Sequence, residues 1–316
     1  KATLHDFVQH KLDSTSQSYS NLRSRHFLVD DDTKIGKKLL GIKYRTRQQK
    51  LSNFTSLHMF VVSLRCEHSC PYCQVSRQSD DKEKYDMSRD IASKGIDLAL
   101  RSPSENIKIE FQGGESLLNF ELIKYIVEEV NVRNNGKNIA FVIATNLAVI
   151  TQEILEYCQL NDIHISTSLD GPKKLHNKNR PRPGKNSYEK TIAGIHMARD
   201  TLGFDKVSAL MTTTEASLLQ PKEIIDEYLS HDFPGIFLRP LSPYGFAIKT
   251  KKFNEYNAER WYNFYVEGLE YIIQINKDGF HFREFYTSTI LKKIFTFTDP
   301  GYVDLMSPSG IGIAAI

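Results

Sequence analysis

Apolar and polar positions alternate in blocks along most of this chain. From residue 58 onward, apolar runs of about six residues are followed by amphipathic stretches of about 12 to 16 residues, which is the pattern of βαβ units. The apolar runs predict buried strands at 58–64, 107–111, 139–144, 163–169, 206–211 and 236–239. Apolar residues three and four positions apart predict helices at 88–101, 120–134, 151–160, 187–201 and 221–230.

Six such units predict an α/β fold in which a curved parallel sheet carries its helices on the outside. Eight units close a TIM barrel, so six units predict an open, partial (βα)6 TIM-like barrel. We expect this barrel over residues 56–250. Residues 1–55 are polar and basic and predict an N-terminal extension with little regular structure, and residues 251–316 predict a C-terminal segment that begins with a long helix over 254–278.

Composition and charge narrow the class of protein. The chain has 316 residues, of which 40% are hydrophobic and 25% charged, as in ordinary globular proteins. A net charge of +3 is too small to indicate nucleic-acid binding, and no apolar stretch is long enough to predict a membrane span. Four cysteines, three of them in one loop, do not form a disulfide framework and indicate a reducing, cytoplasmic compartment. Because the chain begins at Lys1 and ends in an apolar run, we expect a piece of a longer protein.

The three clustered cysteines, Cys66, Cys70 and Cys73, follow the first predicted strand with the spacing C-x3-C-x2-C. Soft thiolates in one loop predict a metal site. A structural zinc site needs four protein ligands, usually in two separated pairs, and here no second pair exists; His68 lies awkwardly between two of the cysteines. Three thiolates on a four-iron cluster would leave one iron open to another ligand. Zinc and other iron–sulfur sites remain alternatives.

Polar residues follow the other predicted strands, at the edge where barrel folds place their active sites. Gly113, Gly114 and Glu115 follow the second strand, and adjacent glycines let a backbone approach a ligand closely. The remaining candidates are Asn146 after the third strand, Ser168 and Asp170 after the fourth, Arg180 further along, and Arg239 at the end of the sixth. Each of these residues could equally serve an ordinary turn, cap or strand end.

The cysteine motif, with Tyr72 directly before its last cysteine, resembles the signature of the radical S-adenosylmethionine (SAM) superfamily. The resemblance implies that the three cysteines hold a [4Fe-4S] cluster whose open iron is chelated by SAM. It also implies that an electron from the cluster cleaves SAM to methionine and a 5′-deoxyadenosyl radical, which takes a hydrogen atom from the substrate.

The same resemblance assigns SAM contacts to the residues at the strand ends. It implies that Gly113, Gly114 and Glu115 hold the amino group of SAM, and that Ser168 and Asp170 contact its ribose and carboxylate. The other residues expected to bind the cofactor are Tyr72, Asn146, Arg180, which would pair with the SAM carboxylate, and Arg239, which would lie near the adenine. The sequence assigns no catalytic acid or base.

Two further segments resemble the peptide-modifying branch of that superfamily, typified by anaerobic sulfatase-maturating enzymes. These are Ser168-Leu169-Asp170-Gly171-Pro172 and Asn179-Arg180-Pro181. In that branch the barrel is followed by a cysteine-rich SPASM or twitch extension. Ser309-Gly310-Ile311-Gly312 resembles its Cys-Gly-x-Gly opening with serine in place of cysteine, so we expect a truncated SPASM/twitch-like region. Residues 64–77 and 302–308 are most similar to the His-Xaa-Ser system maturase, B-type.

This resemblance implies a peptide maturase. Its substrate would be a ribosomally made peptide or protein, for example a His-Xaa-Ser repeat peptide, and its electron donor a flavodoxin or ferredoxin. The alternatives are a radical SAM enzyme acting on RNA or a small molecule, a non-catalytic metal-binding module, and an inactive fragment. Zinc in anaerobically purified protein would favour the metal-binding module. That hypothesis does not explain why Gly113, Gly114 and Glu115 follow the second strand.

Overall fold

The computed structural model describes residues 2–28, 34–47, 53–75, 77–251, 256–296 and 313–316. The chain divides into two compact units, Lys1–Ser52 and Asn53–Ile316. None of the helices that it describes is long and apolar enough to cross a membrane.

The first unit is helical, so the expectation of little regular structure before residue 55 was wrong. It contains α1 (Ala2–Val8), α2 (Gln17–Ser24) and α3 (Lys34–Arg47). The hydroxyl of Ser16 accepts a hydrogen bond of 3.1 Å from the backbone N–H of Tyr19, which caps the first turn of α2. The α3 segment is rich in lysine, leucine and arginine, which favour a helix even in a basic sequence.

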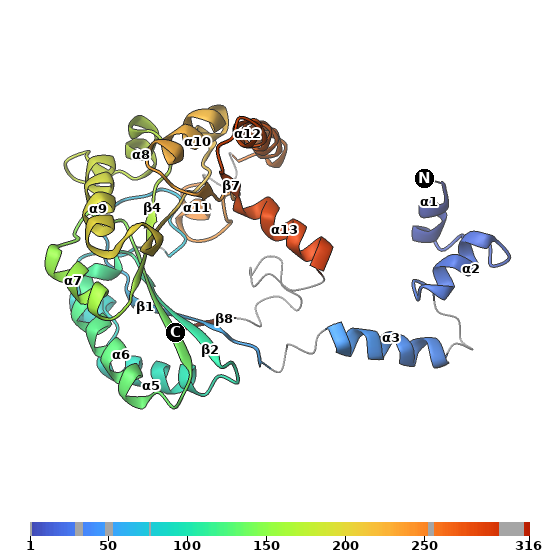
Figure 1. Ribbon diagram of the computed structural model, residues 1–316, viewed down its shortest axis with the longest axis horizontal. Helices are drawn as coiled ribbons and strands as arrows, with labels where there is room; N and C mark the ends of the chain where they lie inside the picture. The colour runs from blue at the N-terminus through green and yellow to red at the C-terminus, as the bar shows by residue number, and fades with distance from the viewer. Residues whose placement is uncertain (1, 29–33, 48–52, 76, 252–255, 297–312) are drawn as a thin grey trace. The chain divides into compact units, whose positions relative to one another are not determined.

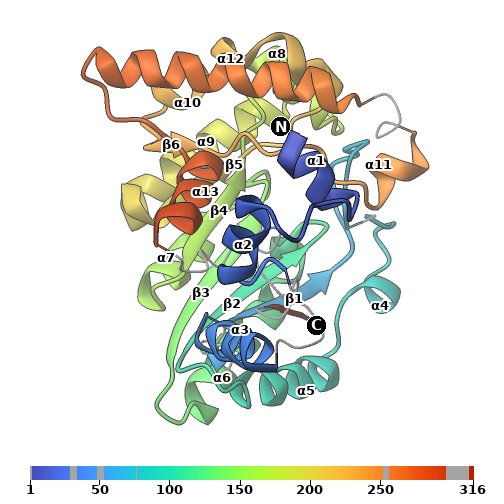
Figure 2. The same ribbon diagram turned by 90° about the vertical axis from the view of Figure 1, so that its right-hand side faces the viewer.

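The second unit is built on a six-stranded, wholly parallel sheet (Figure 2). Its strands, in spatial order, are β5 (Val207–Leu210), β4 (His164–Ser168), β3 (Asn138–Thr145), β2 (Asn106–Gly113), β1 (Leu57–Ser63) and β8 (Ile313–Ala315). A mixed α/β structure with a parallel sheet of this size confirms the predicted fold class, a partial TIM-like barrel.

Helices cover one face of this sheet, which we call the outer face, and the opposite face is called the inner face. Figure 1 shows that α5 (Arg89–Leu100), α6 (Phe120–Arg133), α7 (Gln152–Leu160) and α9 (Ser187–Leu202) follow one another along the outer face. The apolar stripe predicted on α6 is confirmed, because Leu122, Ile123, Ile126, Val127 and Val130 are all buried. Ser88 caps α5 by accepting from the N–H of Ile91.

The sixth strand of the sheet is not the one predicted. Residues 236–239 contribute only β6 (Gly235–Ile236), which pairs with β7 (Arg283–Glu284) in a separate two-stranded sheet. Beyond β6, the N–H of Leu238 donates to the carboxylate of Glu284 at 3.1 Å instead of to a strand of the main sheet. The sixth place is taken by β8, which extends the sheet at its opposite edge, beside β1.

The remaining elements connect or follow these units. The long C-terminal helix is α12 (Ala258–Lys277), close to its predicted bounds, and it packs against α10 (Pro221–Ser230). The shorter elements are α4 (Lys82–Tyr85), η2 (Ser116–Asn119), α8 (Lys173–Asn179), η3 (Phe204–Lys206), η4 (Glu215–Leu219), α11 (Phe246–Lys249) and α13 (Phe285–Thr296). Two segments used for the resemblances lie outside the described residues: 302–308, which was compared with the His-Xaa-Ser maturase, and 309–312, which was compared with the SPASM/twitch opening.

Candidate functional site

The cysteine loop begins where β1 ends and is anchored by Arg65, which the sequence did not single out. This guanidinium is almost fully buried and binds Asp86 through Nε and Nη2, each at 2.8 Å. It also contacts Asp80 at 3.0 Å and the carbonyl oxygen of Leu118 at 2.8 Å. Such bidentate, charge-assisted pairs fix geometry as well as adding stability. The residue directly before Cys66 is therefore held rigidly.

The three clustered cysteines share one cavity at the carboxyl ends of the strands. Cys66, Cys70 and Cys73 are half-buried, unpaired thiols that line a cavity of about 250 Å³. Burial raises the pKa of Cys70 to about 12 and also raises the pKa of Cys66. Metal binding would offset this cost of burying a thiolate, since cysteine thiols lose their protons on coordination and the metal compensates the negative charge.

The spacing of these thiols tests which metal group they fit. Two sulfurs on one zinc ion, with bonds of about 2.3 Å, lie at most about 4.6 Å apart. Among the described residues, only Cys66, Glu67 and His68 bring three potential ligand atoms within 4.8 Å of one another. The sulfurs of Cys66, Cys70 and Cys73 form no such group. Their wider arrangement around one cavity fits a multi-iron cluster better than a single ion.

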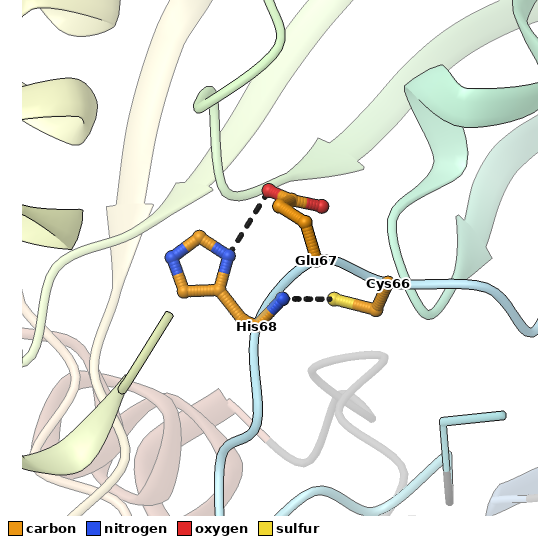
Figure 3. A group of neighbouring side chains, drawn as sticks. All are labelled: Cys66, Glu67 and His68. Atoms are coloured by element: carbon orange, nitrogen blue, oxygen red, sulfur yellow. Dashed lines mark hydrogen bonds and ion pairs between the residues drawn. The ribbon is translucent and has the colours of Figure 1, made fainter. Parts of the chain in front are cut away.

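Cys66, Glu67 and His68 are consecutive in the loop (Figure 3). The backbone N–H of His68 contacts the sulfur of Cys66 at 3.4 Å, and Nδ1 of His68 lies 3.0 Å from the carboxylate of Glu67. The same Nδ1 lies 3.0 Å from the side-chain amide of Asn146. His68 is thus a buried residue that ties the loop to the end of β3, which is a structural role.

Gly113 and Gly114 bring the end of β2 against the start of the loop. A Cβ atom on Gly113 would lie 2.0 Å from the carbonyl oxygen of Ser63, and one on Gly114 would lie 2.2 Å from that of Arg65. Both contacts are with backbone, which cannot move away as a flexible side chain could. The N–H groups of Gly114 and Glu115 donate to those same carbonyls, at 2.8 and 2.7 Å. The two glycines are needed for this close approach.

Glu115 is absent from the residues that line the cavity, and its expected contact with the amino group of SAM stays a prediction. Its buried carboxylate accepts hydrogen bonds from the hydroxyl of Thr145 at 2.6 Å, the N–H of Asn146 at 2.8 Å and the N–H of Leu117 at 3.1 Å. Burial, with the nearby charge of Glu67, raises the pKa of Glu115 to about 7. These bonds join the end of β2 to the end of β3.

Asp170 is likewise absent from the lining of the cavity. It is fully buried and accepts hydrogen bonds from the hydroxyl of Tyr72 at 2.5 Å, from Arg180 at 3.1 Å and from the N–H of Thr212 at 3.2 Å. Burial alone would raise the pKa of Asp170, but Arg180, His176 and the hydrogen bonds outweigh burial and lower it. Arg180 also lies over the ring of Tyr72, with its Cζ 5.5 Å from the ring centroid.

The other predicted residues converge on the cavity. Its lining includes Tyr72, Gly113, Gly114, Asn146, Ser168, Arg180 and Arg239, together with the three cysteines. Sequence reasoning missed Arg77 and the inner-face positions Glu110, Gln112 and Ser166, which also line it. The sequence signal for the last three is that apolar residues such as Ile109 and Ile165 take every second position of β2 and β4, so that the residues between them face away from the helices.

Comparison with known proteins identifies the family of this chain. Residues 60–226 match the family described as the Radical SAM superfamily. Because the match covers more than half of the chain, the chain belongs to the radical SAM superfamily, whose members use a [4Fe-4S] cluster and SAM. The cysteine loop, the Gly-Gly segment and the residues that follow β3 and β4 fall within the matched range, whereas Arg239 lies beyond it.

Two curated proteins are similar in sequence to this chain. The chain is 35% identical over 139 residues to the uncharacterized protein MJ0907 of Methanocaldococcus jannaschii, covering 44% of this chain and 46% of that protein. It is 28% identical over 142 residues to the serine-type anaerobic sulfatase-maturating enzyme of Bacteroides thetaiotaomicron, covering 44% and 34%. The chain thus spans less than half the length of these two curated relatives.

A solved structure supports the fold. The structure of native anSMEcpe with bound AdoMet and Cp18Cys peptide aligns with a TM-score of 0.62 at 17% identity, covering 77% of this chain and 66% of that one. At this identity the likeness establishes the shared barrel architecture alone.

Proposed function

We propose that this protein is a radical SAM maturase that modifies a ribosomally made peptide or protein. The observation that carries the proposal is the single cavity at the carboxyl ends of the strands, lined by three thiols and by the glycine pair after β2. Relatedness to a sulfatase-maturating enzyme supports a peptide or protein substrate, as does the fold shared with an enzyme solved with a bound peptide.

Each group in the cavity has a proposed task. Cys66, Cys70 and Cys73 supply three ligands to the cluster. When bound, the cluster and SAM supply reductive cleavage and hydrogen-atom abstraction. Arg180, held in place by Asp170, presents a guanidinium that suits a planar carboxylate such as that of SAM.

The proposed roles of the other cavity residues follow from the chemical groups that they carry. The backbone around Gly113 and Gly114 can approach a ligand closely, and Asn146 and Ser168 offer hydrogen bonds to polar groups of the nucleoside. Tyr72 and Arg239 complete the wall as proposed contacts to the cofactor. Glu115 and Asp170 are proposed to position these groups and not to touch SAM, which revises the sequence-based assignment.

The finer identity is part of the same proposal. The sequence of residues 64–77 favours the B-type maturase of a His-Xaa-Ser system. Its proposed substrate is a His-Xaa-Ser repeat peptide, and its proposed electron donor is a flavodoxin or ferredoxin. Unpaired cysteines support a reducing, cytoplasmic setting. The proposed organisation is an extension over 1–55, a barrel over 56–250, and over 251–316 a helical segment with the start of a SPASM/twitch-like region.

The decisive test is anaerobic reconstitution of the chain, with iron and sulfide counted per chain and EPR spectra of the reduced protein recorded with and without SAM. We expect about four irons per chain and a spectrum that changes on adding SAM. Stoichiometric zinc, or a cluster that ignores SAM, would contradict the proposal. Incubation with a synthetic His-Xaa-Ser repeat peptide, followed by mass spectrometry, then tests the proposed substrate.

A further inference from the structure

The inner face of β2 presents a carboxylate to the cavity. Along this strand Ile107, Ile109 and Phe111 are buried against the helices, so the alternate residues Glu110 and Gln112 face the other way. Both line the cavity that contains the three thiols. Glu110 precedes Gly113 by three residues, which places it about 10 Å further into the barrel at the usual rise of a strand.

The neighbours of Glu110 leave its charge uncompensated. Strand register places it beside Met59 on β1 and Val142 on β3, and both neighbours on its face are apolar. Its one hydrogen bond among the described residues is accepted from the side-chain amide of Gln112 at 2.5 Å. Within that part of the chain, no lysine, arginine or histidine lies within ion-pair distance of it.

A half-buried carboxylate in such surroundings favours a charged partner. Charge near apolar groups is costly unless it is paired, and a carboxylate binds an ammonium or guanidinium through strong, charge-assisted hydrogen bonds. Gln112 fixes Oε1, which leaves Oε2 for such a partner. The arginines of the cavity, Arg77, Arg180 and Arg239, come from loops beyond the strand ends, and Arg180 already pairs with Asp170.

We infer that Glu110 is a specificity-determining residue that binds a cationic side chain, lysine or arginine, of the substrate peptide. This inference rests on the proposed function, because it assumes that a peptide enters the barrel. The inference adds that a residue of the substrate peptide, at or near the position that reacts, carries a positive charge. SAM is itself a cation, so binding of SAM by Glu110 is the competing role to be tested.

The experiment uses the reconstituted, SAM-bound protein and blocked tripeptides with lysine, arginine, leucine or glutamate between two glycines. Binding is measured by saturation-transfer NMR titration. Wild-type protein should bind the lysine and arginine peptides about tenfold more tightly than the leucine peptide, the range expected for a hydrogen bond to a charged group. Glu110→Gln, which keeps the shape and removes the charge, should abolish this preference.

Two further variants control the test. Glu110→Asp keeps the charge on a shorter side chain and should restore part of the preference. Asp90→Asn removes an exposed carboxylate from α5, where Asp90 pairs with Lys94, and this variant should bind every peptide as wild type does. Iron content and SAM affinity are measured for each variant, because they show whether Glu110→Gln acts on the peptide or on the cofactor.

The outcomes separate this inference from the proposed function. Equal binding of all peptides by wild type, or a cation preference that survives Glu110→Gln, overturns the inference while leaving SAM cleavage intact. A loss of SAM affinity in Glu110→Gln overturns it as well and assigns the carboxylate to the cofactor. Failure of the wild-type protein to bind or cleave SAM instead removes the proposed function, on which the inference rests.

Discussion

The hydroxyl of Tyr72 donates a 2.5 Å hydrogen bond to Oδ2 of Asp170, which joins the cysteine loop to the chain that leaves β4. Tyr72 lies between two of the cysteines, and Asp170 also holds Arg180 and the N–H of Thr212 after β5. One buried carboxylate therefore connects three segments that are far apart in sequence. The loop that is proposed to hold the cluster is fixed from behind by this residue.

Asp170→Asn should destabilise the protein by about 3 kcal/mol, since breaking a buried ion pair leaves an uncompensated charge on Arg180. The free energy of unfolding from urea titration measures this loss. Asp162→Asn is the matched control, because Asp162 pairs with Lys206 at an exposed site and such pairs contribute about 0 to 1 kcal/mol. Equal losses in the two variants would mean that Asp170 has no special structural role.

Replacing any one of Cys66, Cys70 and Cys73 with alanine should abolish 5′-deoxyadenosine formation, because the cluster would lose one of its three protein ligands. Iron and sulfide per chain, measured after anaerobic reconstitution, should fall in parallel. Cys158→Ala should keep its cluster and its activity, because Cys158 is buried in α7 among core residues. A variant of the loop cysteines that still released 5′-deoxyadenosine would defeat the assignment.

Gly114→Ala should impair assembly of the cluster and lower stability by at least about 2 kcal/mol, since its Cβ would overlap the carbonyl oxygen of Arg65. Cluster content by absorbance and thermal unfolding measure the two effects. Gly41→Ala, in α3, meets no atom within 4 Å and should be neutral or slightly stabilising, because alanine favours a helix. A Gly114→Ala protein with a full cluster would show that the loop tolerates a larger separation between residue 114 and the backbone of Arg65.

Stability should fall in mild acid because of His176. Burial lowers the pKa of this histidine to about 4; Asp170 and Glu189 favour its protonation, whereas Arg180 and His68 oppose it. An unfolded histidine titrates near 6.5. The unfolded chain therefore takes up the proton first, and stability that is complete above pH 6.5 is lost as pH falls towards 4.

The size of this effect follows from linkage, at about 1.4 kcal/mol per pH unit, or about 3 kcal/mol by pH 4. His176→Asn lacks the titrating group, so its unfolding free energy should fall less than that of wild type between pH 7 and pH 4. Urea titrations at several pH values measure the difference. Parallel curves for the two proteins would contradict a buried, neutral histidine at this position.

Most of the barrel could be predicted because its strands and helices have different periodicities. The first five strands and the helices after them lie close to their expected bounds, since β-strands such as 107–111 and helices such as 120–134 each bury one apolar face. The prediction of a sixth strand at 236–239 was wrong for a physical reason. A short apolar run such as 236–239 indicates burial, but it does not tell which sheet edge, or which other element, will bury it.

The candidate site shows a similar division. Position in the chain placed Gly113, Asn146 and Ser168 at the carboxyl ends of the strands, because every parallel strand ends at the same edge. Arg180 lines the same cavity from the end of α8. It could not tell which way a side chain points. Glu115 and Asp170 are absent from the lining of the cavity and accept hydrogen bonds from buried N–H and hydroxyl donors, an arrangement that depends on neighbours distant in sequence.

The pairing of β8 with β1 has a consequence for folding. Leu57 lies opposite Ile313, so β1 gains its second neighbour only after every other described element of the chain has been synthesised. Contacts between segments so distant in sequence form late and slowly. Until then one edge of β1 exposes unpaired N–H and carbonyl groups, which are sites for pairing with other chains. The nascent protein would be most prone to aggregation at the strand that leads into its cysteine loop.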